Sequence, residues 1–344
     1  MSDEKLTQAA TELNKYFKKM IIAPASLMIG SEIPRISSGS IALNIEIGGG
    51  FPRGRLIEIF GRESSGKTYI TLKTMAEAQK LGKGLWIDAE GVFDPAWSKL
   101  VGVDLDKLDL AVPETGEQAG TILDTAVRSN EYSLIVLDSV ASLLPTEDLE
   151  KAMNESERIG NRAMMMNRIV RKIQSGLNTR VDGKPNQTCI IFINQIRENI
   201  GVTYGNADDT PGGLGVRFGA SMRLLMWRAD LIKEKPEEGD TGALSDGKII
   251  TGITIKFKTV KNKTFTPLKS GQFILYTEGE RGAQIDKTDE IMRYGIVSGV
   301  IKQSGPSYAY AGHKFLGKEA VANFLKENPK EIDIIYEEIK KVYR

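Results

Sequence analysis

The sequence predicts an α/β fold in which helices cover both faces of a mostly parallel central sheet. Two observations predict this class. From about residue 41 to residue 195, short apolar runs alternate with segments of helical spacing, which is the pattern of strands buried on both faces. In addition, a Gly-x4-Gly-Lys-Thr sequence at residues 61–68 lies between an apolar run and a helix-like segment, as a phosphate-binding loop requires.

The expected elements follow in chain order. Continuous apolar runs predict strands at 56–60, 84–89, 108–112, 134–138 and 189–193. Segments with helical spacing separate them, at 67–81, 94–101, 116–129 and 155–179. Three further β-rich runs, at 222–228, 250–260 and 272–276, precede a helical region near 318–342. This order predicts one large α/β domain with a smaller appendage.

Three segments do not fit the alternation. Residues 4–21 carry apolar side chains three or four apart and predict an amphipathic helix, which docks on the main body or on a neighbouring protomer. Residues 196–215 contain five glycines and no regular period, so they predict a long loop, which is usually functional or disordered. Residues 233–247 are rich in Glu, Lys, Gly and Asp and predict a solvated excursion.

Composition restricts the function classes. No apolar stretch among the 344 residues approaches membrane-spanning length, and the first residues lack a secretory signal pattern. One cysteine, Cys189, fits a reducing cytosol, and one histidine, His313, cannot build a histidine-rich metal site. We therefore expect a cytoplasmic protein without membrane association. The net charge of +1 means that any polyanion must bind to local basic clusters.

The loop at 61–68 carries the chemistry of triphosphate binding. Gly61 and Gly66 allow successive backbone N–H groups to face one anion. Lys67 supplies a positive charge for the β- and γ-phosphates, and the Thr68 hydroxyl can ligate Mg²⁺. The alternative is a glycine-rich turn that merely contains a lysine, but the strand–loop–helix context favours nucleotide binding. We expect ATP and Mg²⁺ as cofactors.

Three polar residues end other predicted strands. Asp138 follows Leu-Ile-Val-Leu and is placed to hold Mg²⁺. Glu90 could orient the water that attacks the γ-phosphate, although a capping or surface glutamate is the alternative. Gln195 could hydrogen-bond the γ-phosphate and couple it to the following loop, or simply end its strand. Asp94 and Pro95 predict a helix N-cap followed by proline at the first helical position.

Together these segments closely resemble the RecA family of recombinases. The matching segments, in order, are Ile-Ser-Ser-Gly-Ser at 36–40, the loop at 61–68, Ile-Asp-Ala-Glu at 87–90, Thr-Gly-Glu-Gln-Ala at 115–119, Leu-Asp-Ser-Val-Ala at 137–141, Phe-Ile-Asn-Gln-Ile-Arg at 192–197 and Val-Lys-Asn-Lys at 260–263. The resemblance runs from about residue 30 to the C-terminus. Two departures are a poorly matching first DNA loop at 147–161 and the lack of an acidic C-terminal tail.

The resemblance implies a role for each site residue. Glu90 would be the catalytic carboxylate and Gln195 the γ-phosphate sensor, while Lys261 and Lys263 would reach a neighbour's ATP. Without the resemblance, both lysines would be read as solvent-facing strand residues. The implied nucleotide contacts are Gly61, Arg62, Glu63, Ser64, Ser65, Gly66, Lys67, Thr68, Tyr69, Asp94, Trp97 and Asp138, with Thr68 and Asp138 at the metal. Phe218 and Arg223 would lie at the interface between protomers.

Two segments are candidates for DNA binding. The helix predicted over 155–180 carries six arginine or lysine side chains, some paired four residues apart on one face. The loop at 196–215 offers backbone N–H groups, Arg197 and apolar side chains that could stack on bases, unless it is a surface loop with incidental apolar residues. The expected DNA contacts are Arg162, Asn167, Arg171, Arg197, Ile200, Gly212 and Gly213.

The resemblance implies an ATP-dependent recombinase that forms a homo-oligomeric helical filament on single-stranded DNA and pairs it with double-stranded DNA in repair and the SOS response. Its implied parts are a docking helix at 1–30, a RecA-type ATPase core at 31–280 and a C-terminal α/β domain at 281–344. A single-strand binding protein and a LexA-like repressor are the implied partners. The alternatives are a hexameric replicative helicase and a non-catalytic recombination mediator, which Val-Lys-Asn-Lys and the intact Glu90 respectively disfavour.

Overall fold

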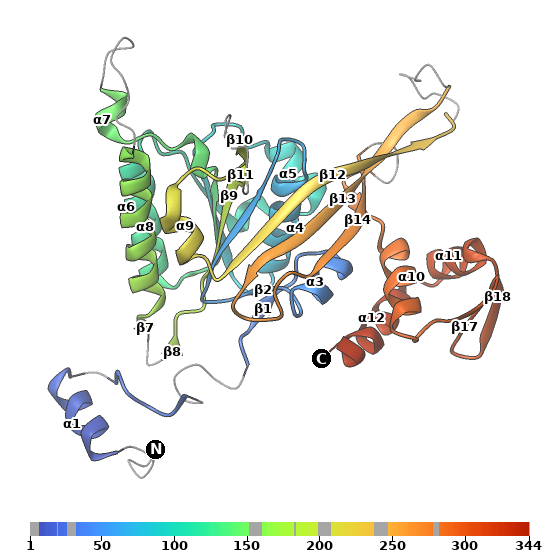
Figure 1. The fold of residues 1–344 in the computed structure, drawn as a ribbon, viewed down its shortest axis with the longest axis horizontal. Helices are drawn as coiled ribbons and strands as arrows, with labels where there is room; N and C mark the ends of the chain where they lie inside the picture. Colours follow the sequence, from blue (N-terminus) through green and yellow to red (C-terminus); the bar gives the residue numbers. More distant parts are fainter. Residues whose placement is uncertain are drawn as a thin grey trace.

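Nine strands of the described chain form one central sheet (Figure 1). The computed structural model describes residues 7–18, 20–25, 32–150, 160–181, 184–198, 208–236, 247–277 and 282–343. In spatial order the strands are β15 (Gln284–Ile285), β14 (Ser270–Tyr276), β13 (Ile249–Asn262), β12 (Met222–Glu234), β3 (Leu56–Gly61), β9 (Cys189–Gln195), β6 (Tyr132–Asp138), β4 (Lys83–Asp88) and β5 (Leu108–Ala111). Neighbours from β12 to β5 pair in parallel, and β12 to β15 pair antiparallel. The predicted mostly parallel sheet is confirmed.

The carboxyl ends of four parallel strands converge at one edge of this sheet. Gly61 at the end of β3 lies opposite Gln195 at the end of β9. Asp88 at the end of β4 lies opposite Asp138 at the end of β6. Since β6 and β9 are also neighbours, the residues that follow these strands meet in one place, as ligand sites in α/β sheets do.

Helices cover both faces of the sheet. On one face, α4 (Lys67–Ala78) and α5 (Pro95–Val101) pack with strand residues such as Ile57 and Ile59. On the other face, α6 (Gly116–Ser129) and α8 (Asn161–Leu177) pack with alternate strand residues such as Leu56. This alternation follows from the two-residue period of a strand, and both faces are apolar because both are buried. The predicted layers are therefore confirmed.

The segment at 196–215 is more ordered at its ends than its sequence predicts. Two short strands, β10 (Arg197–Glu198) and β11 (Asp208–Asp209), pair antiparallel, and α9 (Gly213–Gly219) begins within the expected loop. Two-residue strands carry no readable period, and the three glycines of α9 lower its helix propensity. Residues 199–207 lie outside the described part. Likewise β12 extends into the start of the predicted excursion at 233–247, whereas β13 begins just after it.

The N-terminal helix is shorter than the predicted 4–21. Helix α1 runs from Gln8 to Tyr16 and begins at an N-cap threonine, Thr7. The chain then turns, because Lys18 has a φ of 52° and Asn14 Oδ1 accepts hydrogen bonds from two later backbone N–H groups. In Figure 1, α1 lies apart from the sheet and its helices.

The C-terminal region has its own core. It contains α10 (Lys287–Val297), β16 (Lys302–Ser304), β17 (Ser307–Tyr310), β18 (His313–Leu316), α11 (Lys318–Glu327) and α12 (Pro329–Tyr343). Sequence analysis predicted only the last two of these as a helical region. Ile41 and Ile45, on the short helix α3 (Ile41–Glu46), pack into this C-terminal cluster although they lie far away in sequence.

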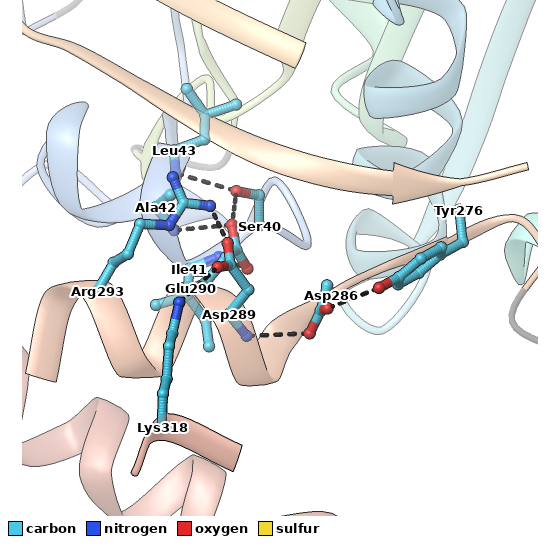
Figure 2. Close-up of polar contacts among 10 residues, drawn as sticks. All are labelled: Ser40, Ile41, Ala42, Leu43, Tyr276, Asp286, Asp289, Glu290, Arg293 and Lys318. Atoms are coloured by element: carbon cyan, nitrogen blue, oxygen red, sulfur yellow. Dashed lines mark hydrogen bonds and ion pairs between the residues drawn. The ribbon is translucent and has the colours of Figure 1, made fainter. Parts of the chain in front are cut away.

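One buried carboxylate joins α10 to α3. Figure 2 shows Glu290 beside the first turn of α3, where its oxygens accept hydrogen bonds from Ser40 Oγ at 2.5 Å and from the backbone N–H groups of Ile41 and Ala42 at 3.0 and 3.1 Å. Ser40 in turn caps α3 by accepting from the Leu43 N–H at 3.0 Å. Burial raises the pKa of the Glu290 carboxyl to about 7.

The remaining described elements are short. They are β1 (Arg35–Ile36), β2 (Phe51–Pro52), α7 (Thr146–Leu149), β7 (Arg180–Val181), β8 (Lys184–Pro185) and the 3₁₀ helices η2 (Leu105–Lys107) and η3 (Val140–Ser142). Across the described ranges, every helix is too short or too polar to cross a bilayer.

Candidate nucleotide and nucleic-acid sites

The loop between β3 and α4 has the backbone of a phosphate-binding loop. Gly66 forms the N-cap of α4. Its φ of 81° lies in the left-handed region, which glycine adopts at no steric cost. Gly61 is needed for another reason, because a β-carbon there would lie 2.1 Å from the carbonyl oxygen of Met226 on β12. The N-terminus of a twelve-residue helix thus faces this loop, as an anion site requires.

The Lys67 ammonium lies inside the loop. It donates hydrogen bonds to the carbonyl oxygens of Gly61 at 3.1 Å and Arg62 at 2.7 Å and to Ser65 Oγ at 3.3 Å. Burial lowers the pKa of Lys67, while nearby carboxylates, Asp138 first, oppose that shift. The other loop side chains divide by exposure: Arg62, Glu63 and Ser64 are exposed, and Ser65 is buried.

Asp138 lies within reach of the first turn of α4. Its buried carboxylate accepts a hydrogen bond from the side chain of Thr68, so the two predicted metal ligands are in contact. Burial, followed by the charges of Glu90 and Asp88, raises the pKa of Asp138 to about 7. A divalent cation bound nearby would stabilise the ionised form of a carboxyl group in this position.

Glu90 is exposed but held by hydrogen bonds from two neighbouring strand ends. Its Oε1 accepts from the hydroxyl of Ser139 and from Ser142 Oγ at 3.1 Å. The side-chain amide of Gln195 donates to the same oxygen at 3.5 Å. The two residues predicted to act on the γ-phosphate therefore touch each other. The sequence predicted no role for either serine, although Ser139 lies in the Leu-Asp-Ser-Val-Ala segment at 137–141.

Asp88 organises the loop that carries Glu90. Its carboxylate accepts hydrogen bonds from the N–H groups of Glu90 at 3.2 Å, Gly91 at 2.8 Å and Phe93 at 2.8 Å. Asp88 is buried, and such side chain–backbone bonds fix the turn after a strand. This residue was also missed, although an aspartate directly before a glycine-containing turn is a recognisable signal.

The predicted base-binding residues lie just beyond this loop. Asp94 caps α5 by accepting from the N–H groups of Ala96 and Trp97, at 2.8 and 3.0 Å, so the predicted cap and first-position proline are confirmed. Trp97 is half-buried against the core beside α4. The Tyr69 ring is buried, and its hydroxyl donates to the carbonyl oxygen of Ala283 at 3.0 Å, which leaves only its backbone to meet a phosphate.

The residues predicted to act across a protomer interface lie near α9. The Lys261 ammonium donates to the carbonyl oxygens of Arg217 at 2.7 Å and Phe218 at 3.0 Å, and so caps the C-terminal end of α9. Lys263 is exposed, and the Phe218 side chain is 70% exposed. Arg223 is mostly buried and pairs with Glu58 of the same chain. Their roles between protomers stay predictions.

Four of the predicted DNA contacts lie on α8 or at the start of α9, two helices that pack against each other. Arg162 Nη1 donates to the carbonyl oxygen of Ala141 at 3.2 Å. A β-carbon on Gly215 would lie 1.9 Å from Oδ1 of Asn167, so α8 and α9 touch there. Gly212 and Gly213, both with positive φ, begin α9.

The other predicted DNA contacts lie further along α8 or in the loop. Arg171 lines a shallow groove with Arg128, Arg168 and Lys172. The backbone of Arg197 is part of β10, whereas its side chain and all of Ile200 lie outside the described part.

The phosphate loop, the Thr68–Asp138 contact and the carboxylate beside them define a P-loop nucleoside triphosphate-binding protein. A family model described as the RecA N-terminal domain matches residues 4–281. Protein RecA of Streptomyces venezuelae is 39% identical over 343 residues, which cover 98% of this chain and 84% of that protein. Protein RecA of Zymomonas mobilis subsp. mobilis is 39% identical over 349 residues, covering 100% and 91%. Protein RecA of Halalkalibacterium halodurans is 38% identical over 351 residues, covering 100% and 93%.

The chain belongs to the RecA family. It is accordingly a nucleotide-dependent recombinase and DNA-dependent ATPase, which binds DNA and forms filaments. The resemblance inferred from the motifs is thereby confirmed for the family and its activity. The assignment of roles to individual residues stays a prediction.

Proposed function

We propose that the chain hydrolyses ATP, held with Mg²⁺ at residues 61–68, while it forms a helical filament on single-stranded DNA and exchanges strands with a homologous duplex. One observation carries this proposal: Lys67, Asp138, Glu90 and Gln195, from four different segments, converge at one edge of the sheet. The candidate DNA segment at 196–215 begins directly after the last of them.

The residues present suit a nucleoside triphosphate with Mg²⁺. Lys67 lies among the loop carbonyls, where its charge can meet phosphate oxygens. Thr68 and Asp138 are in contact, and a hydroxyl and a carboxylate this close together can share one magnesium shell. When bound, Mg²⁺ supplies charge neutralisation for the phosphates. Asp138 then keeps its negative charge, which burial otherwise disfavours.

Glu90 is the proposed catalytic carboxylate and Gln195 the proposed sensor. The serines beside Glu90 fix the direction of its carboxylate, so that it can orient a water and accept its proton. Gln195 contacts the same carboxylate oxygen. A hydrogen bond from Gln195 to a γ-phosphate would compete with this contact, and nucleotide state would thereby change the start of the DNA segment.

Single-stranded DNA is proposed to bind along α8, α9 and the segment between Gln195 and Gly213. The packing of α8, which carries Arg162 and Asn167, against α9, which Gly212 caps, supports this path, because a guanidinium, an amide and a glycine backbone all suit phosphate. Arg171 and its basic neighbours extend the positive surface along α8. Arg197 and Ile200 are proposed to complete the contact from the loop itself.

Filament contacts are proposed to come from the N-terminal segment and from residues within the core. Residues 1–30 would dock on a neighbouring copy, which the exposed apolar side chains of Leu13, Tyr16 and Phe17 on and after α1 support. Residues 31–280 would form the ATPase core, and residues 281–344 a C-terminal α/β domain. Lys261, Lys263, Phe218 and Arg223 would meet the neighbour's ATP site, with the lysines supplying charge in trans.

We place the protein in the cytoplasm, with a single-strand binding protein and a LexA-like repressor as partners in DNA repair. The presence of a single cysteine supports the reducing compartment. Membership in the RecA family supports the partners.

Steady-state ATPase measurements with and without single-stranded DNA test the proposed function. We expect the rate to rise when the DNA is added and electron microscopy to show helical filaments in the same samples. Equal rates with and without DNA would contradict a DNA-coupled ATPase, and closed rings that unwind duplexes would favour a helicase.

A further inference from the structure

Asn194, the residue before the candidate sensor, makes an unusual number of buried contacts. Its side chain is fully buried at the end of β9. Nδ2 donates to Glu58 Oε1 at 2.8 Å and to the carbonyl oxygen of Pro211 at 2.9 Å, while Oδ1 accepts from the Gln195 N–H at 3.0 Å. Both amide hydrogens are thus used, and a flipped amide would set an oxygen against two other acceptors.

Glu58 anchors this arrangement from the neighbouring strand. It lies in the middle of β3 with no exposed surface, and a buried carboxylate is costly without partners. Its second oxygen accepts from Arg223 Nε at 2.5 Å, across the parallel β3–β12 pair in which the two residues are directly opposite. The Arg223 guanidinium also stacks on the Phe60 ring, 4.6 Å from its centroid.

The same carboxylate therefore connects to both ends of the candidate DNA segment. Asn194 links it to the start, through the Gln195 N–H, and to the end, through the Pro211 carbonyl. Arg223 reaches the end as well, because its Nη2 donates to Thr210 Oγ1 at 3.3 Å. Pro211 is followed directly by the glycine that caps α9.

We propose that Asn194, held by Glu58, is a positioning residue that couples the sensor Gln195 to Pro211, near the end of the candidate DNA segment at 196–215, and to α9. The proposal rests on the proposed sensor role of Gln195. If the Gln195 main chain moves, either its N–H loses the hydrogen bond to Asn194 Oδ1 or the Asn194 side-chain amide moves with it. Movement of that amide weakens its hydrogen bond to the Pro211 carbonyl oxygen. Nucleotide state at the phosphate loop thereby reaches Thr210 and Pro211, near the far end of the DNA segment.

The test is the ratio of ATPase rates with and without single-stranded DNA in the full-length Asn194→Ala variant. We expect that ratio to fall about tenfold, the usual size of coupling between two sites, while the affinity for a fluorescent ATP analogue changes little. Asn194→Ser leaves a smaller cavity than Asn194→Ala does and keeps one hydrogen-bond donor. It should therefore fold even if the alanine variant does not, and its ATPase ratio should fall by less.

Asn186 provides a matched control. It is also buried, lies just before the opposite end of β9, and uses its amide to bind the carbonyl oxygen of Val127 and the Thr188 N–H. Asn186→Ala should lower the melting temperature as much as Asn194→Ala does and leave the ATPase ratio unchanged. A purely structural role for Asn194 predicts that the two variants behave alike, which would overturn the proposal.

Hydrogen exchange in the wild-type protein gives a test that needs no variant. Addition of a non-hydrolysable ATP analogue without DNA should slow amide exchange in residues 210–219 together with that of Gln195. Unchanged exchange in 210–219 would refute the coupling. If wild-type ATPase does not respond to DNA, the proposed function fails as well, whereas a normal response in both Asn194 variants refutes only this inference.

Discussion

The Ser139 hydroxyl donates a hydrogen bond to Glu90 Oε1, although the two residues are 49 positions apart in the chain. They meet because β4 and β6 are parallel neighbours whose last residues, Asp88 and Asp138, lie opposite each other. The side chains that follow two such strands face the same space. The register of the sheet thus fixes the direction of the proposed catalytic carboxylate, and this can be tested at each partner.

Glu90→Gln should retain nucleotide binding and abolish turnover. The amide keeps the size of the carboxylate but cannot accept a proton from water, so kcat should fall by about 100-fold or more, as for loss of a general base. Filaments formed with ATP should then persist, which electron microscopy over time can follow. Hydrolysis at the wild-type rate would exclude the assigned role.

Ser139→Ala should have a smaller effect of the same kind. Glu90 keeps its charge but loses a fixed donor, so kcat should fall about tenfold, in line with the loss of one hydrogen bond to a charged group. The KM for ATP should change little. Ser129→Ala is the control, because that serine donates to the Ala126 carbonyl oxygen and accepts from the Glu131 N–H before β6 begins, whereas Ser139 follows the other end of that strand. An equal loss in both variants would indicate a general effect on folding.

Lys67→Ala should weaken nucleotide binding. The ammonium donates hydrogen bonds inside the loop, and loss of a charged hydrogen-bond partner should weaken ATP affinity about 10- to 100-fold. Isothermal titration calorimetry with an ATP analogue measures this. Lys80→Ala changes the same charge just after α4, where the side chain pairs with Glu77 on the surface, and it should bind normally.

Sequence analysis predicted the sheet, its layers and the phosphate loop because their signals are local. A strand buried on both faces is a continuous apolar run, as at 134–138, whatever its neighbours are. The loop is likewise recognisable because Gly66 and Lys67 must be adjacent for their roles. The Asp94-Pro95 pair is a local signal as well, and the sequence correctly predicted Asp94 as a helix cap.

The contacts between segments could not be predicted from one sequence. Ser139 and Asn194 owe their positions to strand register, which depends on pairing between residues far apart in the chain. Helix α3 escaped prediction because its six residues are too few to show a period, and its apolar face packs against the C-terminal region. Tertiary packing decided these elements, not local propensity.

Lys261 bonds to the end of α9 within its own chain, so its proposed action on a neighbour needs a test that separates the two. Lys261→Ala alone should lower DNA-stimulated ATPase about tenfold or more, as for loss of a charge supplied in trans. Mixing it with Glu90→Gln protein creates interfaces between protomers in which the Lys261→Ala copy supplies an intact ATP site and the Glu90→Gln copy supplies an intact Lys261. We therefore expect the mixture to recover activity that neither variant has alone.

If Lys261 acts only as a cap for α9, mixing cannot restore the missing group to the copy that needs it. The mixture would then show no more activity than the sum of its components. Mixing Lys67→Ala with Glu90→Gln is the control, because both changes lie in the ATP site. Every interface between two such copies then contains a defective ATP site.

Glu290 gives the protein a pH-dependent contact between α3 and α10 (Figure 2). Hydrogen bonds from Ser40, Ile41 and Ala42 and the charge of Arg293 favour the ionised form, but burial outweighs them and raises the pKa from 4.5 to about 7. Because the folded-state pKa is above the unfolded value, Glu290 is protonated in the folded state and ionised in the unfolded state between pH 4.5 and about 7. The contribution of Glu290 to stability is therefore fully present below pH 4.5 and is lost as the pH rises through 7.

Urea unfolding of the wild-type protein and of Glu290→Gln, measured from pH 4.5 to pH 8, tests this sign. The glutamine does not titrate, so subtracting its free energy of unfolding cancels the other ionisable groups. The difference should decrease with rising pH by roughly 3 kcal/mol in total, at 1.36 kcal/mol for each unit of pKa shift. A difference that grows with pH would mean that the hydrogen bonds to the carboxylate outweigh its burial, and that Glu290 is ionised where α3 and α10 meet.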